Sequence, residues 1–458
     1  MIVQTIAQSG CIPFTTAQRR ARALLLLLAI FQGGCADQGT QPVPNDTGVS
    51  LQLVDVASRE VYLKLSVDQA HLADTVLLQR DGVAIHQFSR VPDTTLIDTG
   101  LTPNSLHQYT VLVPSVHSPS QQASALCVRT LALSNSNFSW QSYLLGEGQD
   151  SYLSGVAIIN DTLAYAVGEV YKTDSTGRLD PNLYNLAKWN GQSWQLMRVT
   201  LPFRGNLITP PIYGIYCFSP TDIWLAGGLV IHGDGNSWVP YDVRLITGRD
   251  SVGFATCWGS SSDDMFFAGQ LGSLVRYAHG SWTLLQSWTT SPIHDLWGVN
   301  DGSTGAAPVF GAVYESWEHP GTNGILEIIG GTTVHALPWD PTKGANSVWS
   351  RQGTPLYASG NGVWKYCSGS WQEILSGLTG YMSAVRGNAL NDIGVVDVSY
   401  TVSHIYHFDG VNWEMFTPQT GLPEFGYVGL AMRGNLLMAV GSGAGSNGWK
   451  GLITIGRR

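Results

Sequence analysis

The segment CWGSSSDDMFFAGQLGSLVRYAHGSWTLL (residues 257–285) sets the architecture of most of this chain. Turns rich in glycine, serine and aspartate separate four short apolar runs, which predicts four successive β-strands. The tryptophan of the fourth run follows a glycine turn and recurs about every 40 to 50 residues. It is found at Trp194, Trp238, Trp282, Trp371 and Trp413. A repeat of this length with one hairpin turn per copy predicts a blade of four strands.

Residues 138–458 hold seven copies of this unit, so we predict an all-β fold with a seven-bladed β-propeller. The seventh copy supplies three strands, up to about residue 455, and lacks the strand that carries the tryptophan. The segment NFSWQSYLL (residues 137–145) precedes the first copy and contains Trp140. We expect this segment to supply the missing strand, because closing the ring in this way removes an exposed sheet edge.

The number of blades remains open to six or eight from the sequence. The fourth copy is long and places Val334 near the position of the repeated tryptophan, and the first copy has an insertion at residues 169–185.

The repeats resemble bacterial propellers with a Trp-Gly-Ser-Ser-x-x-Asp-Asp blade motif; the related segment here, WGSSSDD at residues 258–264, is one residue shorter. More distantly they are similar to the photosystem assembly factor, kelch and sialidase-type propellers. This resemblance implies the fold and no particular activity, because propellers have many functions.

Residues 49–132 show short strands of alternating pattern, which predict a β-sandwich. The segments LLQRDG (residues 77–82) and TLIDTGLTP (residues 95–103) resemble strands C and E of fibronectin type III domains. Leu65 stands where that family has a tryptophan, and His107 where it has its corner tyrosine. We therefore expect a fibronectin type III-like, immunoglobulin-like sandwich in front of the propeller.

The N-terminus has the features of an export signal. Arg19, Arg20 and Arg22 precede an apolar run at residues 23–31, which is too short to span a membrane. Gly33 and Gly34 then lead into Cys35, which resembles the lipobox of bacterial lipoproteins.

The resemblance implies a signal peptide at residues 1–34, a lipidated Cys35, and a flexible tether at residues 35–48. It places the protein in the bacterial cell envelope, lipid-anchored and extracytoplasmic, at the outer membrane or cell surface. Simple secretion and an uncleaved anchor remain the alternatives.

The amino-acid composition excludes some classes of binding partner. The net charge is −9, and cleavage of the arginine-bearing signal would make the chain more acidic. This argues against nucleic acid and anionic lipid headgroups, which need a basic surface. Only 12% of residues are charged, and the many glycines suit short strands joined by tight turns.

Two sets of repeated residues are expected to be structural. Asp222, Asp264 and Asp392 recur before the second strand of a blade, where aspartate commonly bonds backbone N–H groups. The repeated tryptophans are expected to pack between adjacent blades. Aromatic residues outside the repeat are better candidates for ligand contact: Trp288, Trp317, Trp339 and Tyr381.

Catalytic and metal motifs are not found. The sequence contains no Gly-x-Ser-x-Gly, His-Glu-x-x-His, P-loop or Cys-x-x-Cys motif, so we expect no catalytic residue, cofactor or metal site. The single cysteines Cys127, Cys217, Cys257 and Cys367 are expected to be buried free thiols.

These features favour a non-catalytic, membrane-anchored extracytoplasmic binding or scaffold lipoprotein that recognises a protein or glycan with one propeller face. A carbohydrate-active enzyme or accessory protein with a site in the central funnel is the alternative. An assembly factor for another envelope complex is a third possibility.

Overall fold

The computed structural model describes residues 48–68, 75–89, 93–113, 121–248, 253–299, 307–315, 323–340, 342–377, 380–399 and 401–458. The expected signal peptide, Cys35, nearly all of the tether and Trp317 lie outside these residues. Within the described part of the chain, no helix has the length and apolar character needed to cross a membrane.

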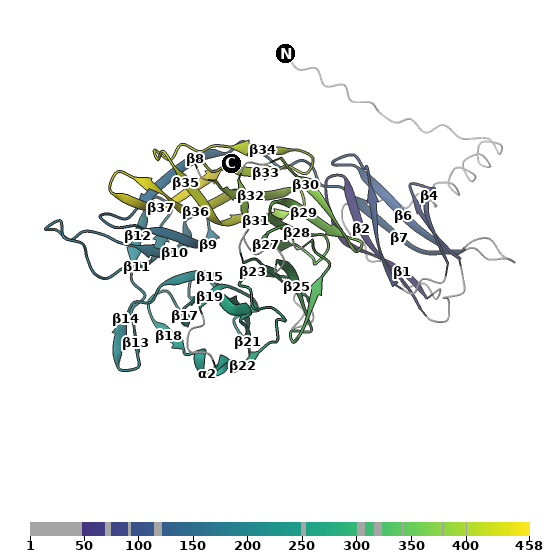
Figure 1. Cartoon of the computed structure of the whole chain (residues 1–458). Helices are drawn as coiled ribbons and strands as arrows, with labels where there is room; N and C mark the ends of the chain where they lie inside the picture. Colours follow the sequence, from purple (N-terminus) through teal and green to yellow (C-terminus); the bar gives the residue numbers. More distant parts are fainter. Residues whose placement is uncertain are drawn as a thin grey trace, which may run out of the picture. The chain divides into compact units, whose positions relative to one another are not determined.

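From residue 139 onward, the described residues form seven four-stranded antiparallel sheets (Figure 1). The first three are β9–β12 (Tyr152–Asn160, Leu163–Val170, Tyr184–Trp189, Trp194–Met197), β15–β18 (Ile212–Ser219, Asp222–Gly227, Val230–Gly233, Trp238–Tyr241) and β19–β22 (Phe254–Ser261, Asp264–Gly269, Leu274–Ala278, Ser281–Leu284). The next three are β23–β26 (Ile293–Gly298, Val309–Val313, Gly324–Ile329, Thr333–Leu337), β27–β30 (Ala345–Ser350, Leu356–Gly360, Gly362–Cys367, Ser370–Leu375) and β31–β34 (Tyr381–Ala389, Asp392–Val398, Ile405–Phe408, Trp413–Phe416). The last combines β35–β37 (Phe425–Arg433, Leu436–Gly445, Gly448–Arg457) with β8 (Ser139–Leu145).

The first strands of the seven sheets follow one another around a closed circle. Each of β9, β15, β19, β23, β27 and β31 lies against the first strand of the next sheet, and β35 lies against β9. The order along the circle is therefore the order along the chain.

The seventh sheet is completed from the other end of the described chain. β8 pairs antiparallel with β37, with Leu145 opposite Gly451 and Ser139 opposite Arg457. This is the pairing that the sequence predicts. It gives β37 a partner from Gly451 to Arg457, along an edge that would otherwise be open to other chains.

The repeated tryptophan occupies one register position in the outer strand of its sheet and packs between neighbouring sheets, as expected. Trp282, for example, lies against a cluster that joins Trp224 of the second sheet to Phe267 of the third. The residues at this position face the following partners: Trp194–Trp189, Trp238–Gly233, Trp282–Tyr277, Val334–Ile328, Trp371–Tyr366, Trp413–Phe408 and Trp140–Gly456.

All seven first strands contain a β-bulge at the same position. The bulged residues, which have no partner in the second strand, are Ser154, Tyr213, Ala255, His294, Asn346, Ser383 and Val428. In most sheets the second strand has a glycine beside the bulge. A Cβ atom would lie 1.8 Å from the Gly344 carbonyl oxygen at Gly360, and 1.9 Å from that of Gly426 at Gly441. These glycines therefore let the bulged backbone approach closely.

The N-terminal residues form two further sheets. One has the order β1-β2-β5 (Val49–Val56, Glu60–Val67, Asp93–Thr99) and the other β4-β3-β6-β7 (Val83–Ser89, Thr75–Arg80, Leu106–Val113, Gln121–Arg129). Residues 52–66 and 93–105 form one compact unit with residues 130–458, whereas the described parts of 48–51, 67–92 and 106–129 form a second unit.

Side chains explain why β2 belongs with the seven sheets. Val61, Leu63 and Leu65 alternate along β2 and are buried on one face, but Tyr62 on the other face is fully buried as well. Tyr62 packs in a cluster with Trp349 and Tyr357 of the fifth sheet. Beside this cluster, Arg351 Nη1 contacts Asp55 Oδ1 at 2.6 Å and Lys365 Nζ contacts Glu60 Oε1 at 2.7 Å.

The cysteines depart from expectation at one position. Cys217, Cys257 and Cys367 are free, and Cys257 is buried. Cys127 is disulfide-bonded, so the expectation of a free thiol is wrong there. It lies on β7, an edge strand of its sheet, and no cysteine spacing in the sequence marks this bond.

We predict that Gly360→Ala destabilises the protein by about 2 kcal/mol, because the added methyl group overlaps the backbone of the bulged strand. The matched control is Gly324→Ala on β25, where a Cβ atom would meet no atom of the described residues within 4 Å. Urea unfolding of both variants measures the difference. Equal stabilities would show that the glycine is not needed for the bulge.

Candidate functional site

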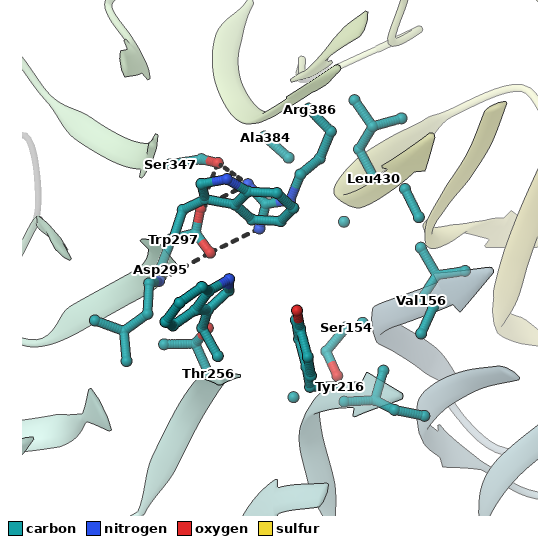
Figure 2. Close-up of a pocket in the computed structure, with 18 of the residues that line it drawn as sticks. Ser154, Val156, Tyr216, Thr256, Asp295, Trp297, Ser347, Ala384, Arg386 and Leu430 are labelled. Carbon is teal, nitrogen blue, oxygen red and sulfur yellow. Dashed lines mark hydrogen bonds and ion pairs between the residues drawn. The ribbon is translucent and has the colours of Figure 1, made fainter. Parts of the chain in front are cut away.

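The first strands enclose a central channel with a cavity of about 310 Å³, shown in Figure 2. All seven strands contribute to its wall. Small residues form much of this wall, among them Gly155, Gly214, Ala255, Ala384 and Gly429. This cavity volume lies at the lower end of the range of volumes typical of small-ligand pockets.

An ion pair is the strongest polar feature of the channel. Arg386 Nη1 donates to Asp295 Oδ2 and Nη2 donates to Oδ1, each at 2.8 Å. Ser347 Oγ also donates to Oδ2 at 2.6 Å, and the Val348 backbone N–H does so at 3.1 Å. Every oxygen of this carboxylate is therefore occupied (Figure 2).

Arg386 connects three consecutive sheets. It belongs to the sixth sheet, donates to the Val348 carbonyl of the fifth at 3.2 Å, and reaches Asp295 of the fourth. Its guanidinium carbon also lies 4.7 Å from the ring centre of Trp297. The planar guanidinium suits this combination of bidentate pairing and stacking.

The bulged residues form a ring near the start of the first strands, at one mouth of the channel. A bulge redirects a side chain. Five of the seven bulged residues have no titratable side chain: Ser154, Ala255, Asn346, Ser383 and Val428. Burial raises the pKa of the Tyr213 phenol, which is therefore neutral as well. The seventh is His294. Although its imidazole borders the channel, the surrounding strands exclude much of the water and lower the pKa of His294 below its usual range.

Asn346 has an unused acceptor at this mouth. Its Oδ1 is buried and has no hydrogen-bond partner within the described protein. A buried acceptor without a partner costs free energy, so such groups need an explanation. An N–H or O–H group of a ligand would satisfy this oxygen.

A second carboxylate lies beside the mouth. Glu169 follows the glycine of β10 and accepts hydrogen bonds from Tyr152 Oη at 2.5 Å and Tyr171 Oη at 3.1 Å. Burial, and then the hydrogen bond to Glu169, raise the pKa values of both phenols, which therefore remain donors.

The repeated aspartates are structural, but their partners differ from those expected. Asp222 Oδ1 contacts His232 Nε2 at 2.8 Å, Asp264 Oδ1 contacts Arg276 Nε at 2.7 Å, and Asp392 Oδ1 contacts His407 Nε2 at 2.8 Å. Each aspartate thus joins the second strand to a basic side chain on the third. The predicted backbone contacts occur instead at the hairpins, where Asp234 Oδ1 accepts from the N–H groups of Asn236 and Ser237.

The predicted aromatic residues do not come together. Trp288 is 74% exposed in the loop after β22. Trp339 packs against Trp364 and Trp371 and donates to the Lys343 carbonyl, and Tyr381 lies against Tyr314. None of these three described residues lines the channel.

The channel residues have a sequence signal that lies outside the known catalytic and metal motifs. Arg386 stands three residues after its bulge, at the position that is Trp258, Trp297 and Trp349 in the three preceding sheets. An arginine at a position that holds tryptophan in three successive sheets marks the site. Asp295 directly follows the bulged His294.

Extra elements lie at the same end of the sheets as this mouth. The hairpin β13–β14 (Leu201–Phe203, Asn206–Ile208), the short helix α2 (Arg244–Thr247) and the turn η2 (Gln270–Gly272) all occur in loops that open at the start of the first strands. In repeat proteins, insertions on one face commonly mark the binding face.

Comparisons with known proteins show the fold. No protein-family model and no curated protein sequence matches the chain. The solved structure of YCF48 bound to D1 peptide is 12% identical with a TM-score of 0.51, and the match covers 71% of this chain and 97% of that one. Two further matches have lower scores. The extracellular domain of BT4673 from B. thetaiotaomicron has a TM-score of 0.47 and is 12% identical, and the match covers 69% of this chain and 40% of that one. The C-terminal WD40 domain of Sif2 has a TM-score of 0.42 and is 11% identical, and the match covers 92% of this chain and 99% of that one. The chain is therefore an all-β protein with a propeller-type fold.

We predict that Arg386→Ala destabilises the protein by about 3 kcal/mol, because Asp295 is left buried without its cation. The double variant Asp295→Leu with Arg386→Met should lose less than the sum of the two single changes, since no unpaired charge remains. Urea unfolding provides the free energies, and the exposed Arg178→Ala is the control. Single changes that each lose under about 1 kcal/mol would contradict this assignment.

Proposed function

We propose that this protein is a non-catalytic, lipid-anchored binding protein of the bacterial cell envelope. In this proposal the seven sheets are the blades of one seven-bladed propeller. A protein partner inserts an extended segment into the mouth of the central channel, where the bulged residues contact it.

The unused acceptor of Asn346 carries this proposal. Together with His294 and Tyr213, it presents neutral hydrogen-bonding groups at the mouth of the channel. Such groups match the alternating N–H and C=O groups of a peptide backbone. YCF48 was solved with a bound peptide, so a propeller can hold one.

The alternative, a carbohydrate-active enzyme, receives less support from the channel. Glycoside hydrolysis commonly needs two carboxyl groups that face the substrate. Among the described wall residues Asp295 is the sole acid, and Arg386 and Ser347 occupy its oxygens. Glu169 beside the mouth is held by two phenols.

The N-terminal part is proposed to act as a spacer. The strand orders β1-β2-β5 and β4-β3-β6-β7 support a fibronectin type III-like sandwich. Cys35 is proposed to carry the lipid, with residues 36–48 as the tether. Of the four predicted aromatic residues, we retain the exposed Trp288 as a contact.

Selection from a displayed library of random twelve-residue peptides tests the function. We predict that peptides selected on residues 49–458 lose at least about tenfold in affinity, or about 1.4 kcal/mol, with Asn346→Leu or His294→Ala. Met415→Ala, on the exposed outer strand β34, should leave affinity unchanged. Selected peptides that bind all variants equally would contradict the proposed mouth, and hydrolysis of oligosaccharides by the protein would favour the enzyme.

Lipidation is tested separately. We predict that Cys35 of the protein purified from a bacterial membrane carries a thioether-linked diacylglycerol, and that Cys35→Ser releases the protein into the soluble fraction. Mass spectrometry of the unreduced N-terminal peptide measures the modification. A Cys35 that retains a free thiol or forms a disulfide would contradict the proposal, because the thioether uses the same sulfur.

A further inference from the structure

Glu169 is a partly buried carboxylate whose hydrogen-bond donors are neutral. It accepts from Tyr152 Oη at 2.5 Å and from Tyr171 Oη at 3.1 Å, and both phenols keep their protons. Within the described part of the chain, no lysine, arginine or histidine forms an ion pair with it. Carboxylates that are largely withdrawn from water are normally paired with a cation. The charge of Glu169 is therefore available to a positive group of a ligand.

The strand register explains how the two phenols hold this carboxylate. Tyr152 on β9 pairs directly with Glu169 on β10, so the two side chains stand on the same face of the sheet. Tyr171 follows Glu169 by two residues and returns to that face. Lys172, the basic residue nearest along the chain, has its Nζ 2.7 Å from Glu147 Oε1 instead. The fold thus orients the carboxylate and pairs the adjacent lysine with another acid.

The carboxylate borders the mouth of the channel. Ser154, two residues after Tyr152 on β9, lines the channel, as does Tyr213, the bulged residue of the next sheet. Burial, and then the charge of Glu169, raise the pKa of the Tyr213 phenol. A charge that acts on a residue of the wall also acts on a group that enters the mouth beside it.

The free lone pairs of the carboxylate match a guanidinium group. An ionised carboxylate has about four lone-pair sites. Tyr152 occupies one on Oε1 and Tyr171 occupies one on Oε2, which leaves sites on both oxygens. Two parallel N–H groups of a guanidinium can bind both oxygens at once, whereas an ammonium group acts as a point charge. Arg386 and Asp295 show this pairing within the channel itself.

A metal ion fits this group poorly. Metal sites commonly combine several side-chain ligands. Among the described residues, no group of three or more histidine, cysteine, aspartate or glutamate side chains is placed to hold a metal ion. The phenols that contact Glu169 donate to its oxygens, so they add no negative charge for a metal.

We propose that Glu169 binds an arginine side chain of the protein partner, next to the segment in the mouth. This proposal rests on the proposed function and adds the chemistry of one partner residue. The net charge of −9 favours the approach of a basic segment. Tyr152 and Tyr171 are positioning residues, because their phenols hold the carboxylate in one orientation.

The first test uses peptides selected from the displayed library on the unchanged protein. We expect them to share one arginine, and to bind Glu169→Gln at least about tenfold more weakly, because the charged pair is lost. Glu414→Gln is the matched control, since it removes the same charge from an exposed position on the outer strand β34. Peptides without a shared arginine, or equal affinity for the two variants, would overturn the proposal.

The second test changes the peptide and leaves the protein intact. Citrulline in place of the shared arginine keeps its shape and removes its charge. This change should weaken binding to the unchanged protein at least about tenfold, and have little further effect on Glu169→Gln, which identifies the contact. Lysine at that position should give an intermediate affinity. Equal losses with both proteins would place the arginine elsewhere and overturn the proposal.

The outcomes separate the two proposals. Peptides that need Asn346 but not Glu169 would overturn the arginine site and leave the proposed function standing. Peptides whose arginine needs Glu169 but that ignore Asn346 and His294 would contradict the proposed mouth and support the arginine site. A library that yields no binding peptide would contradict the proposed function, and the arginine site would fall with it.

Discussion

The pairing of β8 with β37 is the constraint on which the rest of the structure depends. It joins a segment just after the N-terminal sheets to the last strand of the chain, with seven residue pairs between Ser139 and Leu145. The seventh sheet then has four strands, and its first strand lies against both β31 and β9. A channel wall built from seven strands needs this closed circle. The bridge from Arg386 across the fifth sheet to Asp295 also needs neighbouring first strands to keep their spacing.

The repeat provides a common geometry, and single replacements within it provide the site. A bulge opens each first strand at the same position, and a glycine in most second strands gives the backbone room for it. The side chains at these positions differ from sheet to sheet. His294 and Asn346 occupy two of the bulges, and Arg386 stands at a position that is tryptophan in the three preceding sheets. The candidate site is therefore the place where the repeat loses its regularity.

The length of the repeat and the residue types in its turns made the sheets predictable. Trp140 and Val334 were placed correctly because each copy has the same register between its last two strands. The ion pair was not predictable, because Asp295 and Arg386 are 91 residues apart and meet only in the closed ring. Burial of Tyr62 was missed for a similar reason. Alternation along β2 indicates which residues share a face, but it does not reveal that the fifth sheet covers the other face. The sequence analysis predicts backbone N–H groups as the partners of the repeated aspartates, and this is wrong. Each of them contacts a basic side chain on the neighbouring third strand instead.

Hydrogen–deuterium exchange of the β8 amides tests the closed ring most directly. In the intact protein we expect the amides of residues 139–145 that donate to β37 to exchange as slowly as their partners in β37, because the two strands share one set of backbone hydrogen bonds. Fast exchange of residues 139–145, at the rate of an unstructured peptide and with β37 still protected, would contradict the account and leave the circle open.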